Sequence, residues 1–470
     1  MQLVLALDQG GQSSRACVFD GRGALLVQAS VPVAESRPAP GRVEQDPEEL
    51  VASLRTAAER ALRELGARAA DVSACGLATQ RSSLACWDKA SGQALAPIFS
   101  WQDTRAADRL ARLEPDAREI ERRTGLRLSP HYGASKLAWC LEHVEAVRAA
   151  RARGTLACGP LASFLAMRLL DERPFVADAA NATRTLLYGL AQNDWDPWLL
   201  ERFGIPRAIL PECRPTRAEF GTLACAGRKI PLRVLTGDQS AALYSGGEPR
   251  ADALYVNLGT GAFAQRPSAL PLAVEGLLTS LVRREQGRSS FVLEGTVNGA
   301  GSALATLGLA DPVAAFERGL CAPGELPLFL NGVSGLAAPY WRADFRSRFI
   351  GSGSPDAQSA AVVESVLFLL LEIEAAMRPA CGAPALIVAS GGLSRSDALC
   401  ARLADLAQLP LERPAASEAT ARGLAWLVRA ADFAGHAPAA ARFEPHAAPQ
   451  LRARHARWRA ALAAALSGGP

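Results

Sequence analysis

Short apolar runs separated by glycine turns open the chain. Residues 3–8, 13–20 and 24–33 predict three consecutive strands, joined by the turns QGGQ and GRG. A helix is expected next, because Asp46 suits the N-cap, Pro47 suits the first helical position and an apolar stripe follows. Three strands followed by a helix are typical of the beginning of a ribonuclease-H-like α/β unit.

The same pattern recurs in the second half of the chain. Residues 253–267 predict strand, GTG turn and strand, and the extended segment 289–295 follows. This repetition indicates two related lobes. Between the two units, a buried strand is predicted to end at Gly237 and a helix to begin near Asp238.

The lobe boundary is expected just beyond that helix. This divides the chain into residues 1–247, an N-terminal lobe, residues 248–430, a C-terminal lobe, and residues 431–470, a basic tail. The segment RARHARWRAALAAAL in the tail predicts a basic surface helix. A solvated helical face is the simpler interpretation of its charge, and a binding patch is the alternative.

Composition excludes several classes of protein. The 470 residues are 49% hydrophobic, which is enough to fill two cores, and the net charge of +4 implies no nucleic-acid partner. The ten cysteines form no CxxC pair and no cluster with His at metal-ligand spacing, so buried reduced thiols are expected. No apolar run approaches about 18 residues and no basic segment precedes the first one, so we expect no membrane span, no signal peptide and a cytoplasmic protein.

The first glycine turn carries candidate phosphate-binding chemistry. A strand that ends in Asp8 and runs into Gly10 and Gly11 puts a carboxylate beside backbone N–H groups that can approach a phosphate closely. Hydroxyl donors and a cation follow in Ser13, Ser14 and Arg15. This segment alone is an equally good hairpin turn. The turn of Gly259, Thr260 and Gly261 has the same place in the second half of the chain. Two such turns at matching positions favour phosphate binding over a simple hairpin.

Two further glycine clusters lie where an apolar run gives way to a helical pattern. Gly299 and Gly301 form one, and Gly391 and Gly392 form the other. Such junctions suit nucleotide contacts, although a helix C-cap or tight packing explains any single one. Asp238 is the best candidate for a general base because it stands at a strand end before a helix, where the alternative role is a helix N-cap.

Motifs along most of the chain resemble those of one enzyme family. They include LALDQGGQSSRACVFD, GLATQRSSLACWDKASGQAL, FSWQDTRA, LSPHYGASKLAW, DAANATRTLLY, TGDQSAAL, GLAAPYW and GGLSRSDALCARLADL, in order from residue 2 to about residue 430. The chain is identified by them as a member of the FGGY family of carbohydrate kinases, most similar to its glycerol kinase branch. The resemblance implies an α/β fold of two ribonuclease-H-like (actin-like ATPase) lobes, with substrate binding and the catalytic base in the first lobe, nucleotide binding in the second and the active-site cleft between them.

The resemblance also implies an activity and a set of site residues. It predicts transfer of a phosphoryl group from ATP, with Mg²⁺, to a hydroxyl of a small sugar or polyol. Asp238 is then the base, and Asp8 and Asp238 are the metal-associated carboxylates. The cofactor contacts carried over by position are Gly10, Ser13, Thr260, Gly261, Gly301, Gly391, Gly392 and Ser396. The substrate contacts are Arg81, Ser82, Trp101, His131, Asp238 and Gln239.

Three departures from the family pattern lie in the implied site. Glycerol kinases have an acid after the arginine, where this chain has Ser82, and a tyrosine where it has His131. Their first turn carries hydroxyl residues where this chain has Gly11 and Gln12. Glycerol is therefore predicted to fit poorly and another polyol or sugar to fit better, unless Tyr132 and a water restore the missing contacts.

Two other classes of function stay open at this point. A catalytically weak sugar- or nucleotide-binding sensor is the alternative to a kinase, although retention of Asp8 and Asp238 argues against it. An actin-like ATPase would share the fold but has no use for the WQD and TQR segments. The sequence leaves a homo-oligomer open and gives neither the substrate nor the phosphorylated carbon.

Overall fold

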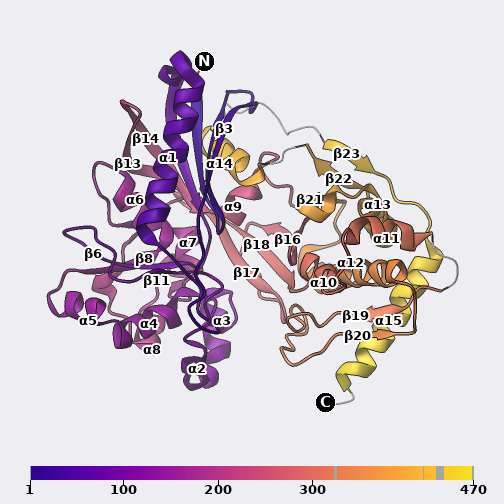
Figure 1. The fold of residues 1–470 in the computed structure, drawn as a ribbon. Coiled ribbons are helices and arrows are strands. Elements are labelled where there is room, and N and C mark those ends of the chain that lie inside the picture. Colours follow the sequence, from indigo (N-terminus) through magenta and orange to yellow (C-terminus); the bar gives the residue numbers. More distant parts are fainter. Residues whose placement is uncertain (1, 322–324, 416–417, 430–438, 468–470) are drawn as a thin grey trace.

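The N-terminal lobe is built on a mixed sheet (Figure 1). The computed structural model describes residues 2–321, 325–415, 418–429 and 439–467. The strand order is β3-β2-β1-β5-β14-β13, in which β1, β5 and β14 run parallel to one another. The strands are β1 (Leu3–Gln9), β2 (Ser13–Phe19), β3 (Leu25–Pro32), β5 (Val72–Thr79), β13 (Arg217–Cys225) and β14 (Arg228–Gly237). The three predicted N-terminal strands and both turns between them are confirmed.

The C-terminal lobe repeats this arrangement. Its sheet has the order β17-β18-β16-β15-β21-β22-β23, and β15, β21 and β22 are its parallel strands. Leaving out β17, the six other strands reproduce the order and directions of the first sheet, so the predicted internal repeat is confirmed. The strands are β15 (Ala253–Leu258), β16 (Ala262–Ser268), β17 (Leu278–Glu285), β18 (Arg288–Val297), β21 (Leu386–Ser390), β22 (Leu411–Pro414) and β23 (Ala439–Phe443).

Helices cover both sheets and complete the two cores. Asp46 caps α1 (Pro47–Leu65) through the Glu48 and Glu49 N–H groups, as its sequence predicts. The other helices of the first part are α2 (Ala107–Leu110), α3 (Ala117–Thr124), α4 (Gly133–His143), α5 (Glu145–Ala152), α6 (Leu161–Leu169), α7 (Ala179–Thr183), α8 (Pro197–Phe203) and α9 (Asp238–Ala242). Those of the second part are α10 (Gly301–Ala305), α11 (Pro312–Leu320), α12 (Pro355–Cys381), α13 (Asp397–Ala407), α14 (Ala419–Arg429) and α15 (Pro449–Ser467).

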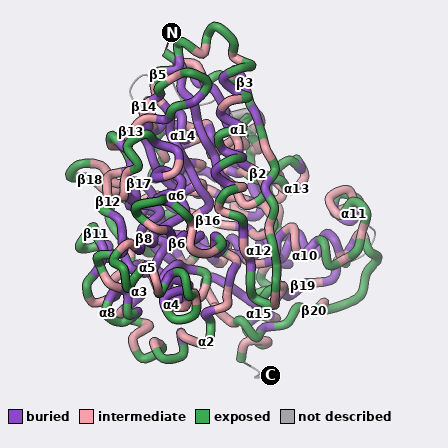
Figure 2. Tube along the Cα trace, turned by 60° about the vertical axis from the view of Figure 1, so that its left-hand side comes forward, coloured by how far each residue is buried: buried purple, intermediate pink, exposed green. Residues whose placement is uncertain are grey.

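Smaller sheets extend the lobes. A four-stranded sheet beside the first lobe contains β4 (Glu44–Gln45), β7 (Ile98–Phe99), β6 (Leu84–Asp88) and β8 (Leu156–Pro160). The remaining strands form pairs: β9 (Val176–Asp178) with β12 (Glu212–Arg214), β10 (Tyr188–Gly189) with β11 (Asp194–Trp195), and β19 (Leu328–Leu330) with β20 (Arg348–Ile350). Figure 2 shows the buried residues in the interior beneath an outer layer of exposed loops.

One helix from the second part of the sequence, α14, lies against the first lobe. It packs on the β1 and β5 side of the first sheet and against α9, where Gly423 lies so close to the Ala241 carbonyl that no side chain would fit. Leu424 and Ala425 share a buried cluster there with Val4 and Ala6 of β1. This helix therefore ties the second part of the chain to the sheet that carries the first glycine turn.

The last helix corrects one sequence interpretation. α15 is helical, as predicted, but it does not simply lie on a solvated surface. Leu451, Trp458 and Leu462 join the core of the C-terminal lobe, and the Trp458 indole donates to the Phe329 carbonyl at 2.8 Å. Alanine and arginine make up most of this helix, so its narrow apolar stripe is hard to see in the sequence. That stripe packs on the lobe, and the opposite face of the helix is solvated.

The compositional expectations concerned the cysteines and the helices. All ten cysteines are free, and seven are buried as predicted, whereas Cys213 and Cys381 are half-buried and Cys321 is exposed. Across the residues that the structure describes, none of the helices combines the length and the apolar character that crossing a bilayer requires.

Candidate active site

The first glycine turn holds a buried carboxylate. Asp8, on β1, is 5% exposed, and its Oδ1 has no hydrogen-bond partner among the described residues. Its Oδ2 lies 3.7 Å from Nη1 of Arg15, which also approaches Glu418. Burial, and then the nearby Asp238, raise the pKa of Asp8 to about 7, while Arg15 acts in the opposite direction. An unpartnered carboxylate oxygen fits a magnesium ion, which prefers one or two protein carboxylates together with phosphate oxygens.

A set of glutamines that the sequence did not point to supports this turn. Gln45 donates to the Gly11 carbonyl at 2.9 Å, and Gln80 donates to the side chains of Gln45 at 2.6 Å and Gln9 at 3.2 Å. All three glutamines are buried. They come from β1, β4 and the end of β5, so only the folded sheet brings them together.

One hydroxyl predicted at the turn is directed elsewhere. Ser14 is buried, and its Oγ lies 2.8 Å from that of Ser53 on α1. Successive strand residues face opposite sides of the sheet, so Ser14 points toward α1 while Arg15 pairs with Asp8. The expectation that Ser14 adds a phosphate donor is therefore wrong. Ser13, on the same side as Arg15, stays a candidate, and its carbonyl accepts the Gly10 N–H at 3.0 Å.

The candidate base stands where β14 meets α9. Gly237 is the N-cap residue and Asp238 is the first helical residue, so the alternative that Asp238 is an N-cap is wrong. Its Oδ1 accepts the Gln239 N–H at 2.7 Å and lies 3.9 Å from Nε of Arg81. Burial raises the pKa of Asp238, and Arg81 opposes that shift. A partly exposed carboxylate held beside an arginine has the position that a general base needs.

Glycine at position 237 is required by that arginine. A Cβ there would lie 2.6 Å from Cγ of Arg81, so the stem of Arg81 packs directly over the strand end. β5 and β14 are neighbouring parallel strands, and parallel strands place their carboxyl ends at one edge of the sheet. This register brings Arg81, after β5, and Asp238, after β14, together.

The remaining predicted substrate residues lie on three neighbouring loops. Ser82 has a φ of 64°, a left-handed conformation that is uncommon for serine. Trp101 is 46% exposed, and its backbone N–H donates to Ser83 Oγ at 3.0 Å. The Nδ1 of His131 lies 3.1 Å from the Trp101 carbonyl oxygen. The structure therefore brings Ser82, Trp101 and His131 together beside Arg81.

A buried ionic group behind Arg81 was not predicted. Arg184, after α7, forms an ion pair with Glu294 on β18, which also accepts from Ser280 at 2.8 Å and Gln265 at 3.0 Å. Burial alone would raise the pKa of Glu294, but Arg184 and then Arg81 lower it to about 2. The pair joins the two lobes.

Tyr132 belongs to the same group. Its side chain is buried, and burial raises its pKa while the neighbouring Arg184 acts in the opposite direction. Tyr132 is therefore directed toward the buried arginines.

The predicted nucleotide residues meet at one end of the C-terminal sheet. The Gly301 N–H donates to the Gly259 carbonyl at 2.9 Å, and a Cβ on Gly301 would lie 2.9 Å from that oxygen. A Cβ on Gly261 would lie 2.9 Å from the Val297 carbonyl oxygen. Gly391 has a φ of 92°, and a Cβ on it would lie 2.5 Å from the Leu258 carbonyl oxygen. Three glycine clusters distant in sequence thus interlock at the carboxyl end of β15.

The other members of this set differ in what they offer to a ligand. Thr260 and Gly392 are exposed at the edge of the cluster. Ser396 is buried; it caps α13 by accepting the Leu399 N–H at 3.3 Å, and its Oγ lies 2.8 Å from Glu317. Its hydroxyl is therefore engaged within the protein. Nowhere in the described residues do three or more His, Cys, Asp or Glu side chains gather as a metal cluster, so a metal site here depends on ligand oxygens as well as Asp8.

Comparison with known protein families identifies the family to which the chain belongs. The model of the N-terminal domain of the FGGY family of carbohydrate kinases matches residues 3–244, and that of the C-terminal domain matches residues 254–431. The chain belongs to the FGGY family of carbohydrate kinases. The predicted family and enzyme class are thereby confirmed, and kinases of this family use ATP together with Mg²⁺.

Individual relatives agree with this assignment. The chain is 37% identical to a glycerol kinase of Methylobacterium nodulans, covering 98% of this chain and 97% of the relative, and 38% identical to a glycerol kinase of Alkalilimnicola ehrlichii, covering 94% and 92%. The structure of Plasmodium falciparum glycerol kinase with ADP superposes with a TM-score of 0.90 at 21% identity, covering 99% of this chain and 98% of that one. A xylulose kinase from Rhodospirillum rubrum gives a TM-score of 0.85 at 21% identity, with 98% of each chain covered. The two-lobed actin-like fold is confirmed.

Proposed function

We propose that this FGGY kinase phosphorylates a hydroxyl of a small polyol or sugar that is longer than glycerol. The observation that carries the proposal is the acceptor side of the cleft, where Ser82 and His131 stand beside Arg81 and Trp101. The glycerol kinase pattern has an acid and a tyrosine at the positions of Ser82 and His131. Losing one charge-assisted hydrogen bond costs about 1.5–3 kcal/mol, or roughly one to two decades of affinity.

The surroundings of Tyr132 bear on this choice of substrate. Its side chain is buried close to Arg184 and Arg81. The tyrosine adjacent to His131 therefore presents no exposed phenol in place of the missing one. A longer acceptor brings additional hydroxyls, which can satisfy the Arg81 donors and occupy the volume left by the smaller Ser82 side chain.

The proposed mechanism assigns one task to each group. Asp238 takes the proton of the attacking hydroxyl, and Arg81 beside it favours the ionised carboxylate that a base requires. The N–H groups of Gly10 and Gly259 donate within the protein, so the other backbone N–H groups of the two glycine turns bind phosphate oxygens. Asp8 would hold Mg²⁺, which when bound offsets the charge on the phosphates. Closure of the two lobes around both substrates would exclude water, the competing acceptor.

ATP turnover with and without a panel of polyols tests this function. Stimulation by one acceptor, with a phosphorylated product, supports the kinase. The alternative, a catalytically weak sugar- or nucleotide-binding sensor, predicts binding without turnover, and a conformational ATPase predicts turnover that no polyol changes. We also expect a cytoplasmic location, because the reaction consumes ATP.

A further inference from the structure

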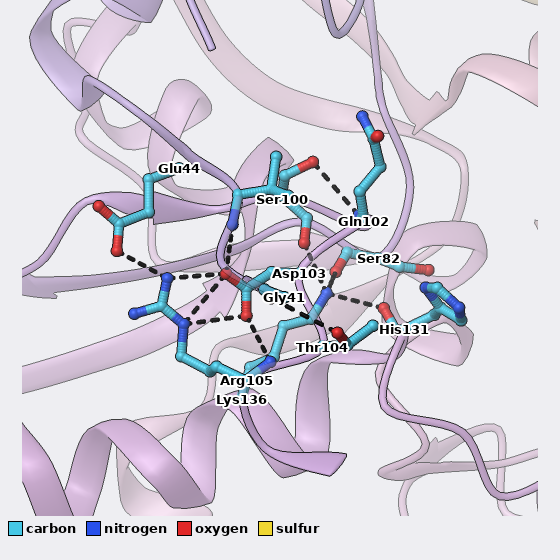
Figure 3. A network of polar contacts seen from close by, with 11 residues as sticks. Gly41, Glu44, Ser82, Ser100, Gln102, Asp103, Thr104, Arg105, His131 and Lys136 are labelled. Carbon is cyan, nitrogen blue, oxygen red and sulfur yellow. Dashed lines mark hydrogen bonds and ion pairs between the residues drawn. The ribbon is translucent and has the colours of Figure 1, made fainter. Parts of the chain in front are cut away.

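Lys136, on α4, is a buried cation with an unusual set of partners. It is 0% exposed, and its ammonium group donates to the backbone carbonyls of Ser100 at 2.7 Å, His131 at 2.8 Å and Ser82 at 3.3 Å (Figure 3). An ammonium group has three donors, so these bonds use its full capacity.

Each of these carbonyls belongs to a different loop of the acceptor site. Ser82 lies on the loop between β5 and β6, Ser100 directly precedes Trp101 after β7, and His131 lies on the loop before α4. These are the loops that carry the three predicted acceptor residues Ser82, Trp101 and His131. One side chain is thus a common hydrogen-bond donor to all three loops.

The surroundings of Lys136 provide little compensation for its charge. Burial lowers the pKa of Lys136 to about 7, and Asp103 acts in the opposite direction. The Asp103 carboxylate is itself engaged by Arg105 at 2.7 Å and by the Val43 N–H at 2.7 Å, and Arg105 also binds Glu44 at 2.6 Å (Figure 3). A buried ammonium without a carboxylate of its own is costly, so its presence calls for a role beyond filling space.

We propose that Lys136 is a positioning residue that sets the spacing of Ser82, Trp101 and His131, and thereby determines which acceptor the pocket selects. The bond to the Ser82 carbonyl also holds that residue in its left-handed conformation. Lys136 acts through the loops and not on the reacting atoms. The inference rests on the proposed function, because it requires that these three residues line the acceptor pocket.

The test compares Lys136→Met with a matched variant, Arg266→Met. Arg266 is also buried, and its guanidinium donates to three backbone carbonyls, those of Gly382 at 3.0 Å, Cys381 at 3.1 Å and Ala251 at 3.2 Å. It lies near the amino end of β15, at the opposite end of the strand from the glycine turn. Both variants remove a buried cation from three carbonyls, but only Lys136→Met affects the acceptor loops.

Steady-state kinetics with the best acceptor, together with melting temperatures, distinguish an effect on the acceptor pocket from a general loss of stability. Lys136→Met should raise the acceptor KM at least about 10-fold and reduce the preference for the best acceptor over the second best, with the ATP KM within about 2-fold of wild type. Arg266→Met should lower the melting temperature and leave the acceptor KM within about 2-fold. An unchanged acceptor KM and preference in Lys136→Met, or equal changes in acceptor and ATP KM, would overturn the proposal.

A second variant and a second measurement cover the cases in which the first comparison gives no result. If Lys136→Met does not fold, Lys136→Arg is tested in its place. The larger guanidinium group should raise the acceptor KM at least about 3-fold, and an unchanged value overturns the proposal.

The kinetics are measured with whichever acceptor the wild type prefers. A preference for glycerol would therefore refute the proposed substrate and leave this test intact. If no acceptor is phosphorylated, amide exchange decides: residues 81–84, 100–104 and 129–132 should exchange faster in Lys136→Met than in Arg266→Met, and equal exchange overturns it.

Discussion

Replacing Asp8 by asparagine should make the protein more stable and less active at the same time. In the folded protein, burial followed by the charge of Asp238 raises the pKa of Asp8 from its ordinary value of 3.8 to about 7. Between these values the folded state keeps a proton that the unfolded chain has lost. The wild type therefore loses stability as the pH rises from about 4 to about 7, and above pH 7 it bears the full cost of the buried charge.

The size of this effect follows from the difference between the two pKa values. The pKa rises from 3.8 to about 7, a difference of about three pKa units. One pKa unit corresponds to roughly 1.4 kcal/mol, so the charged form of Asp8 costs the folded state about 4 kcal/mol. Asparagine is uncharged at every pH, so Asp8→Asn should be more stable than the wild type by up to about 4 kcal/mol at pH 8. At pH 5 the advantage should be less than half as large, because the folded wild type is then protonated.

Chemical denaturation at pH 5 and pH 8, with and without Mg²⁺ and ATP, measures the change in stability, and steady-state rates measure the change in activity. Mg²⁺ with ATP should stabilise the wild type more than Asp8→Asn, and turnover of the variant should fall by at least about 100-fold. Asp108→Asn removes the same charge from an exposed position on α2 and serves as the control. A variant no more stable than the wild type at pH 8, or one with undiminished stabilisation by Mg²⁺ and ATP, would contradict the role given to Asp8.

Two further substitutions test the rest of the site. Asp238→Asn should keep the fold and ATP binding but lower turnover by at least about 100-fold, as comparison of ATP-binding calorimetry with steady-state rates would reveal; near-normal turnover removes Asp238 from the mechanism. Glu294→Gln leaves Arg184 and Arg81 without their shared buried carboxylate and should reduce the free energy of unfolding by roughly 3–5 kcal/mol. In denaturant titrations the double variant Arg184→Met/Glu294→Gln should recover part of that loss, whereas simple additivity would show that the two residues act independently.

Much of the fold could be predicted because its signals are local. The alternation of apolar runs and glycine turns reports strands and hairpins within about ten residues, and the cap at Asp46 lies within one helical turn of its partners. The repeat of that pattern predicts the second lobe. The interlocking of Gly261, Gly301 and Gly391 also follows, since each cluster ends a strand at the same edge of one sheet.

The features that were missed depend on contacts between distant segments. Arg184 and Glu294 are 110 positions apart, and Gln45 and Gln80 are 35 apart, so no local pattern announces either contact. Lys136 is the one charged residue in the buried first part of α4, and its role appears only when three loops converge on it. Ser14 failed as a phosphate donor for a simpler reason: its place in the strand alternation faces it toward α1.

The central claim concerns the acceptor, and kinetics on glycerol, erythritol, ribitol, xylulose and ribulose test it most directly when the wild type is compared with Ser82→Glu. The account predicts that one of the longer acceptors has a higher kcat/KM than glycerol in the wild type. It also predicts that Ser82→Glu, by restoring one charge-assisted hydrogen bond, shifts the ratio toward glycerol by roughly a decade. A wild type that prefers glycerol, with a ratio that Ser82→Glu leaves unchanged, would contradict it.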